Sequence, residues 1–190
     1  MRAVVLVEGD SDRIAVLTIA RRRGHDLHTA GVSVVAMGGA TNIRRYLERF
    51  GPQGCDLPVA GLYDLAEEPF FVRALSRAGG ATVDTTATLA ARGFFVCHRD
   101  LEDELIRAMG APRVLEVVEA EAELGSFRLL QSQPAHRDAC VHDQLHRFIG
   151  TKSGRKARYS RLLAEAVPWD RVPRPLSRVL THAYRSMDRS

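Results

Sequence analysis

Four short apolar runs, each followed by a segment whose apolar residues recur at helical spacing, are the feature that most constrains the fold of this 190-residue chain. The runs are rich in Val, Leu and Phe, as buried strands are, and they cover residues 3–7, 31–37, 57–63 and 93–97. Helices are predicted between them, over residues 11–23, 41–50 and 69–77. Strands that alternate with helices form a sheet whose two faces are covered. We therefore predict an α/β fold with a mostly parallel four-stranded sheet flanked by helices.

From about residue 101 onward the pattern changes to helices alone. Apolar residues recur at helical spacing in five segments, which predict helices over residues 101–109, 111–124, 136–149, 156–167 and 175–187. No long stretch of flexible-linker composition separates these segments from the first part of the chain. We therefore divide the chain into an α/β core, residues 1–110, and a helical region, residues 111–190, that packs on the core to form one compact unit.

The composition is that of an ordinary globular protein, with 45% hydrophobic and 26% charged residues. No apolar run approaches the roughly 20 residues that cross a bilayer, and the start has no basic segment followed by a long apolar one. These features predict a cytoplasmic protein with no membrane contact. Three widely spaced cysteines, Cys55, Cys97 and Cys140, argue against a disulfide framework or a zinc ribbon. The net charge of +4 permits contact with an anionic polymer without identifying one.

Acidic residues follow three of the four predicted strands. Glu8 comes after the first strand, Asp64 after the third, and Asp100 with Glu102 after the fourth, while Asp12 lies in the first turn of the first helix. Because the carboxyl ends of parallel strands share one edge of a sheet, these side chains are expected to converge. A divalent cation would relieve their mutual repulsion, and oxygen ligands suit Mg²⁺ or Mn²⁺. The alternative for each acid taken singly is a helix cap or a solvated loop residue.

Two histidines also have a metal-compatible spacing. His142 and His146 lie four residues apart on a predicted helix, but no third ligand or HExxH pattern accompanies them. We interpret them as part of a polar helix face.

The segments VLVEGDSD, VVAMGG and VAGLYDLAEE resemble the TOPRIM domain of topoisomerases, bacterial primases and several nucleases. The marks of that domain are a Glu-Gly turn after the first strand and a DxD turn after the third. The resemblance extends further, because EGDSD, GVSVVAMGGATNIRRYL, RDLEDEL and the late helix start that contains lysine are similar to the nuclease end of the OLD (overcoming lysogenization defect) family. It covers most of the chain and implies a TOPRIM-like, that is Rossmann-like, sheet with a helical C-terminal region.

The resemblance also implies an activity, which is metal-dependent cleavage of phosphodiester bonds, with DNA favoured over RNA as the substrate. The OLD nucleases are thought to use two metal ions. Carried over position by position, the motifs imply that Asp64 is a metal ligand and that Glu8 is a ligand or a proton-handling group. The remaining metal-coordinating or metal-positioning residues would be Asp12, Asp100 and Glu102.

One departure from the family pattern bears on activity. The second acid of the DxD turn would fall at position 66, which is Ala66 in this chain and cannot coordinate a metal. Glu67 or Glu68 has a stem long enough to substitute for it. Two interpretations therefore stay open: a nuclease that binds one metal well and the second weakly, or a degenerate module that binds nucleic acid or a protein partner without cutting.

Basic residues supply the other candidates. Arginine provides all but two of the 27 basic side chains, and the two lysines, Lys152 and Lys156, lie close together in TKSGRKARYS. The resemblance places the catalytic lysine of the OLD family in this region, with Lys156 slightly preferred; a solvated basic loop is the alternative. Five arginines are predicted to contact backbone phosphates, and these are Arg44, Arg45, Arg155, Arg158 and Arg161.

The OLD proteins that the chain resembles join an ATPase region to the nuclease region. The sequence contains no GxxxxGK[ST] motif, so a P-loop is not predicted here. We therefore expect that this protein works alone or that an ATPase or another protein partner acts in trans. The oligomeric state is left open.

Overall fold

A computed structural model describes residues 1–79, 85–152 and 154–187. Its centre is a sheet of four parallel strands in the order β2-β1-β3-β4. The strands are β1 (Ala3–Val7), β2 (Val32–Ala36), β3 (Val59–Asp64) and β4 (Phe94–Cys97). This arrangement confirms the predicted fold class.

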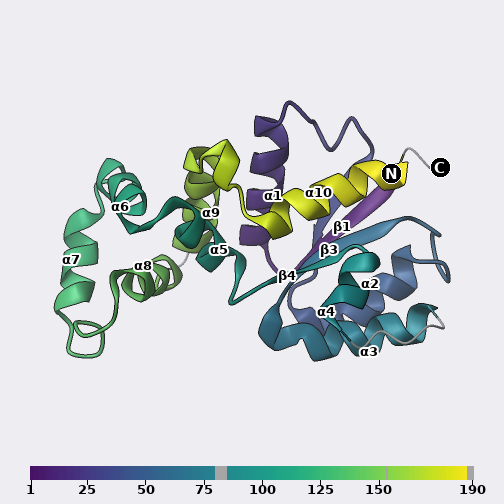
Figure 1. The fold of residues 1–190 in the computed structure, drawn as a ribbon, viewed down its shortest axis with the longest axis horizontal. Helices are drawn as coiled ribbons and strands as arrows, with labels where there is room; N and C mark the ends of the chain where they lie inside the picture. Colours follow the sequence, from purple (N-terminus) through teal and green to yellow (C-terminus); the bar gives the residue numbers. More distant parts are fainter. Residues whose placement is uncertain (80–84, 153, 188–190) are drawn as a thin grey trace.

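Helices cover both faces of the sheet (Figure 1). On one face lie α1 (Asp10–Arg22) and α10 (Arg174–Met187). On the other lie α2 (Ile43–Phe50), α3 (Glu68–Gly79) and α4 (Thr86–Ala91). Successive side chains of a strand point to opposite faces. Accordingly, Val5 and Val7 of β1 join the apolar cluster under α1 and α10, whereas Val4 and Leu6 join the cluster under α2 and α3.

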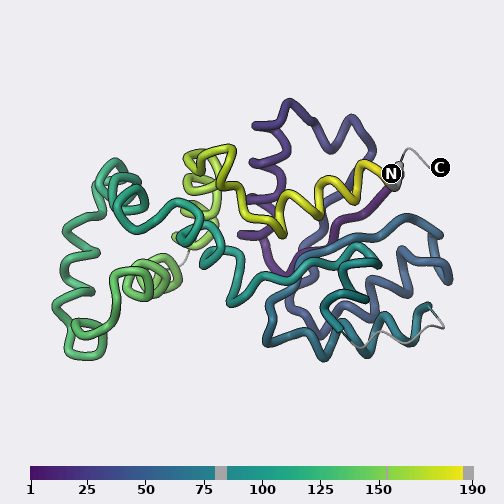
Figure 2. Tube along the Cα trace, in the orientation of Figure 1, coloured from purple at the N-terminus to yellow at the C-terminus, as the bar shows by residue number. Residues whose placement is uncertain are grey.

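The remaining helices extend from the carboxyl edge of the sheet. They are α5 (Leu101–Met109), α6 (Ala111–Ala120), α7 (Leu124–Ser132), α8 (Val141–Gly150) and α9 (Arg155–Ala166). Three short 3₁₀ turns complete the described chain: η1 (Ala40–Asn42), η2 (Leu65–Glu67) and η3 (Trp169–Arg171). Figures 1 and 2 show α6, α7 and α8 lying away from the sheet, beyond α5 and α9. We call these three helices the helical extension.

The late helices do not all occupy this extension. Helix α9 packs along α1, and α10 packs directly on β1, β3 and β4. The helical region expected over residues 111–190 therefore includes α10, which lies on the sheet, as well as the helical extension. One apolar cluster runs from the α1 face of the sheet into the helical extension, where Val114, Phe127 and Phe148 are fully buried. No helix in the described ranges has the length and apolar character needed to cross a membrane.

Two predicted helices have other bounds in the structure, and α7 was not predicted. The helix expected over residues 111–124 ends at Ala120, because Ala122 adopts a left-handed conformation with φ of 55° and turns the chain between α6 and α7. Helix α8 begins at Val141, five residues after the predicted start at residue 136.

Candidate metal centre at the carboxyl edge of the sheet

Three carboxylates meet where β1 and β3 end. Glu8 directly follows β1, Asp64 is the last residue of β3, and Glu67 closes η2. One ligand oxygen from each lies within 4.8 Å of the others. Parallel pairing of β1 with β3 brings Glu8 and Asp64 to the same edge, and η2 folds Glu67 back over them. We call these three residues the acidic centre.

The turn after β3 shows how the chain accommodates Ala66. Ala66 is exposed, whereas the neighbouring Glu67 joins the acidic centre. Glu68 points elsewhere, since it accepts hydrogen bonds from Tyr63 Oη at 3.0 Å and from Thr86 Oγ1 at 2.9 Å. Of the two glutamates that could replace the missing acid, the structure therefore brings Glu67 to the site. The Oε2 atom of Glu67 is buried and lacks a hydrogen-bond partner within the described chain, as an oxygen placed to receive a cation would.

The other predicted acids surround this centre. Asp12, in the first turn of α1, accepts a hydrogen bond from the Gly9 backbone N–H at 2.9 Å. Glu102, in the first turn of α5, is buried and accepts a hydrogen bond from Ser160 Oγ at 3.1 Å. Asp100 caps α5 by accepting from the Asp103 backbone N–H at 2.8 Å. The strand ends thus gather all five predicted carboxylates into one region.

Burial and the nearby negative charges raise the pKa of three acids at this edge of the sheet, which are Asp12, Asp64 and Glu67. Burial, followed by the charge of Glu102, raises the pKa of Asp12 to about 7. Burial, followed by the charges of Glu8, Asp12 and Asp100, raises the pKa of Asp64 to about 8. Burial, followed by the neighbouring carboxyl group of Glu8, raises the pKa of Glu67 to about 7. At neutral pH the site therefore retains protons, which a divalent cation would displace on binding. This donor set, all carboxylate oxygen, fits Mg²⁺ or Mn²⁺.

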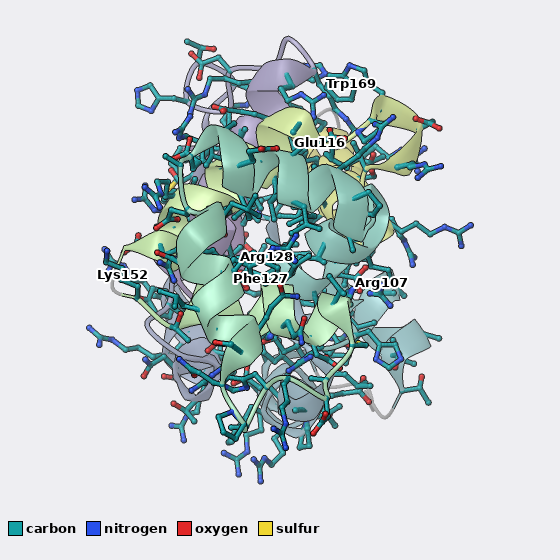
Figure 3. The ribbon with its side chains drawn as sticks, turned by 90° about the vertical axis from the view of Figure 1, so that its left-hand side faces the viewer. Arg107, Glu116, Phe127, Arg128, Lys152 and Trp169 are labelled. Carbon is teal, nitrogen blue, oxygen red and sulfur yellow. The ribbon has the colours of Figure 1, made fainter. Side chains whose placement is uncertain are left out.

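The two lysines lie in different surroundings. Lys156, in the first turn of α9, places Nζ 3.2 Å from Glu102 Oε2. Burial alone would lower the pKa of Lys156, but the charges of Glu102, Asp12 and Asp100 outweigh it and raise that pKa. Lys152 is exposed, and Figure 3 shows it at the rim of the molecule. Of the two lysines, Lys156 therefore lies against the predicted carboxylates, next to Glu102.

Comparisons with known proteins identify a related domain and similar folds. Residues 1–65 match the family model described as "Overcoming lysogenization defect protein-like, TOPRIM domain". The structure of the C-terminal region of the Xanthomonas campestris pv. campestris OLD protein superposes with a TM-score of 0.77 and 28% sequence identity, covering 98% of this chain and 94% of that one. Residues 1–65 therefore match a TOPRIM domain, and the chain as a whole resembles the C-terminal region of OLD proteins.

A second relative supports the same fold. The C-terminal region of the Burkholderia pseudomallei OLD protein superposes with a TM-score of 0.76 at 23% identity, covering 98% of each chain. The OLD-like fold therefore includes the helical extension as well as the matched residues 1–65. A comparison with curated proteins finds no significant match.

In this OLD-like chain, two histidines contact the start of α5. His146 Nε2 lies 2.6 Å from Asp100 Oδ2, and His142 Nε2 lies 2.7 Å from Asp103 Oδ1. Both histidines were predicted to lie on a polar helix face, and their pairs with Asp100 and Asp103 were not predicted. No local signal marks these pairs, because they join residues 39 and 46 apart in sequence through the packing of α8 on α5. Burial disfavours the Asp100 carboxylate, but its hydrogen bonds to His146 and the Asp103 N–H lower its pKa.

The arginines proposed to contact phosphate are in unlike environments. The prediction that Arg155 contacts a backbone phosphate is corrected by the structure. Its side chain is 8% exposed, and its guanidinium is hydrogen-bonded to Glu123 and to the Phe148 carbonyl. It stabilises the OLD-like helical extension and does not face solvent. Arg158 also pairs with Glu123, and its side chain is 39% exposed.

The other three arginines are exposed, two on α2 and one on α9. Arg44 pairs with Glu48 at 2.7 Å and Arg161 with Glu165 at 2.9 Å, each within its own helix. Arg45 is exposed on α2. Phosphate contacts by these three residues stay a prediction.

Proposed function

We propose that this protein is a metal-dependent nuclease that cleaves phosphodiester bonds in DNA. The observation that carries the proposal is the acidic centre, in which Glu8, Asp64 and Glu67 converge at the carboxyl edge of an OLD-like TOPRIM fold. Acids whose pKa values are raised by burial and by neighbouring like charges are typical of functional sites, and a bound cation would neutralise their mutual repulsion. The resemblance to OLD proteins favours two metal ions. An ATPase or another protein acting in trans belongs to the same proposal.

In this proposal the residues of the acidic centre hold the first ion, with Asp12, Asp100 and Glu102 available to a second. When bound, Mg²⁺ or Mn²⁺ supplies Lewis-acid activation of water and stabilises charge on the phosphate that is attacked. The chain's own groups position and compensate these charges. Lys156 brings a positive charge to Glu102, and it is placed to offset negative charge that develops on a phosphate. His146 fixes the orientation of Asp100.

A degenerate module that binds nucleic acid or a protein partner is the second candidate, because Ala66 offers no carboxylate. Supercoiled plasmid distinguishes the two. The nuclease proposal expects conversion to nicked or linear DNA with Mg²⁺ or Mn²⁺ present, no conversion with a chelator, and no conversion by Glu8→Gln in either condition. Intact plasmid in every condition, from protein whose melting temperature still rises with Mn²⁺, would instead support the degenerate module.

Glu67→Gln tests whether the residue after Ala66 supplies the missing acid. This change keeps the side-chain size but removes a carboxylate charge from the acidic centre, so we expect metal-dependent cleavage to fall by about tenfold to a thousandfold. Glu68→Gln is the matched control, because Glu68 bonds Tyr63 and Thr86 instead. The readout is the cleavage rate as a function of Mn²⁺ concentration. Equal losses in the two variants would remove Glu67 from the proposed ligand set.

A further inference from the structure

Helix α10 presents a stripe of basic side chains along one face. Arg174, Arg178, Thr181 and Arg185 recur at steps of four, three and four residues, which places them in line on one side of the helix. All four residues are exposed. Within the described residues, no carboxylate forms an ion pair with any of the three arginines. This differs from Arg44 and Arg161, which are neutralised by a glutamate on the same helix.

The stripe borders a groove along the free edge of the sheet. Strand β4 is the edge strand, and α4 and α10 flank it. Two hollows lie there and share Ala90, Phe95 and Arg178, so they form one continuous groove. One end reaches Leu65, the residue after Asp64, and the other reaches Arg185. The groove therefore begins at the residue that follows Asp64 and runs along α10. Figure 1 shows α10 lying across one face of the sheet.

The charge within this groove is positive. Arg174, Arg178, Arg185 and Arg107 line it together with one carboxylate, Glu104. That carboxylate is compensated, because Arg107 pairs with it at 2.6 Å and the His98 backbone N–H donates to it at 3.0 Å. The Arg178 guanidinium lies 4.7 Å from the centre of the Phe95 ring, a stacking contact that holds it in place.

The dimensions suit a nucleic acid backbone. Arg185 lies eleven residues after Arg174 on the helix, a rise of about 16 Å at about 1.5 Å per residue. A strand of duplex DNA carries one phosphate for about every 3.4 Å of axis, so the stripe spans about five phosphates. Guanidinium groups bind phosphate oxygens with two parallel hydrogen bonds, which favours arginine over lysine at such a surface.

We infer that the arginine stripe of α10 and the β4 edge form a track for the backbone of one DNA strand, and that the track leads this strand to the acidic centre. Delivery of the strand to the acidic centre rests on the proposed nuclease function. The binding itself depends only on the charge and spacing of the stripe. The partner is therefore a polyanionic strand held through its phosphates, with no reading of base sequence.

Binding without metal tests the track separately from cleavage. Fluorescence anisotropy would follow a labelled DNA strand of about 20 nucleotides, in chelator, from about 50 to 200 mM NaCl. The variant combines Arg174→Gln, Arg178→Gln and Arg185→Gln. The control combines Arg113→Gln, Arg128→Gln and Arg147→Gln, which remove equal charge from three exposed arginines of the helical extension. Melting temperatures check that both variants fold.

We expect the track variant to bind at least about tenfold more weakly at 100 mM NaCl, with the slope of log K against log salt reduced by about 2, since each lost phosphate contact removes about 0.7. The control variant keeps the wild-type slope. Equal losses in the two variants, a loss with no change of slope, or no loss at all would each overturn the track; the last result would point to an acidic protein as the occupant.

The same variants separate the two proposals. Plasmid cleaved at the wild-type rate by the track variant would reject the track and leave the nuclease proposal standing. Wild-type protein that does not cleave, but binds DNA through the stripe with the expected salt dependence, would reject the nuclease proposal and leave the track.

Discussion

Asp64→Asn is expected to reduce metal-dependent plasmid cleavage by at least about a thousandfold and, at the same time, to stabilise the metal-free protein at alkaline pH. The change keeps the shape of the side chain, but a neutral amide is a much poorer ligand for a hard divalent cation than a carboxylate. A ligand that contributes about 4 kcal/mol to transition-state stabilisation accounts for about a thousandfold in rate. Initial rates of plasmid nicking with Mn²⁺ measure this loss.

The gain in stability follows from the upward shift of the Asp64 pKa on folding. Burial and the charges of Glu8 and Asp12 raise that pKa from 3.8 to about 8 in the folded protein. Between these pH values the folded state holds a proton that the unfolded state has released. The resulting stabilisation is complete below about pH 4 and is lost as the pH rises to about 8. Asparagine has no proton to lose, so the variant avoids the penalty of a crowded, ionised carboxylate.

Melting temperatures of the metal-free proteins, at about pH 4 and pH 8.5, test whether the variant gains stability as the pH rises. We expect the variant and the wild type to melt alike at the lower pH. At the higher pH the variant should melt about 2–4 °C higher for each kcal/mol of repulsion that is removed. Asp138→Asn is the control, because its side chain is 87% exposed and should shift neither value. A variant that is less stable than the wild type at pH 8.5 would contradict the charge crowding that we assign to the acidic centre.

Mn²⁺ adds a second readout to the same experiment. A cation binds the deprotonated carboxylates of the folded state, so it should raise the wild-type melting temperature more at pH 8.5 than at pH 6. Asp64→Asn should remove most of that rise. An equal rise in the variant would place the bound cation away from Asp64.

The sheet and the convergence of acids at its edge could be predicted because both depend on local patterns. A short apolar run followed by a helical segment identifies a parallel strand, and parallel strands necessarily end at a common edge. Glu8 and Asp64 could therefore be predicted to lie close together. The sequence left Glu67 and Glu68 as alternatives for the missing acid, because the choice between them depends on the 3₁₀ turn η2, which folds residue 67 inward and leaves Ala66 outside.

Contacts between distant helices were beyond the reach of the sequence. Glu121, Ala122 and Glu123 are ordinary helix formers, so the left-handed turn at Ala122 carries no local signal. The burial of Arg155 against Glu123 could not be predicted either, because the exposure of an arginine depends on which acid folds against it. The pairing of His146 with Asp100 joins residues 46 apart in sequence, and it exists because α8 packs on α5.

The second large effect concerns the helical extension. Glu123→Ala is expected to lower the free energy of unfolding by about 3 kcal/mol. Glu123 accepts hydrogen bonds from Tyr159 Oη at 2.9 Å and Arg155 Nη2 at 3.0 Å, and it also pairs with Arg158. The Arg155 guanidinium is buried over the Phe148 ring at 3.9 Å. Removal of one partner of a buried ion pair costs about 3–5 kcal/mol, because the other charge is left without compensation.

Chemical denaturation and melting temperature measure this loss, which corresponds to about 6–12 °C for a chain of this size. Glu121→Ala is the matched control, because Glu121 is more exposed and approaches Arg158 at 3.5 Å without contacting Arg155. Burial opposes ionisation of Glu123, but Tyr159 and the two arginines lower its pKa. Its contribution is therefore present above its unfolded pKa near 4.5 and is lost in stronger acid, so the gap between variant and wild type should narrow as the pH falls below 4. Equal losses for the two glutamate variants, or a gap that does not change with acid, would show that packing of α7, and not the charge of Glu123, holds the extension on α9.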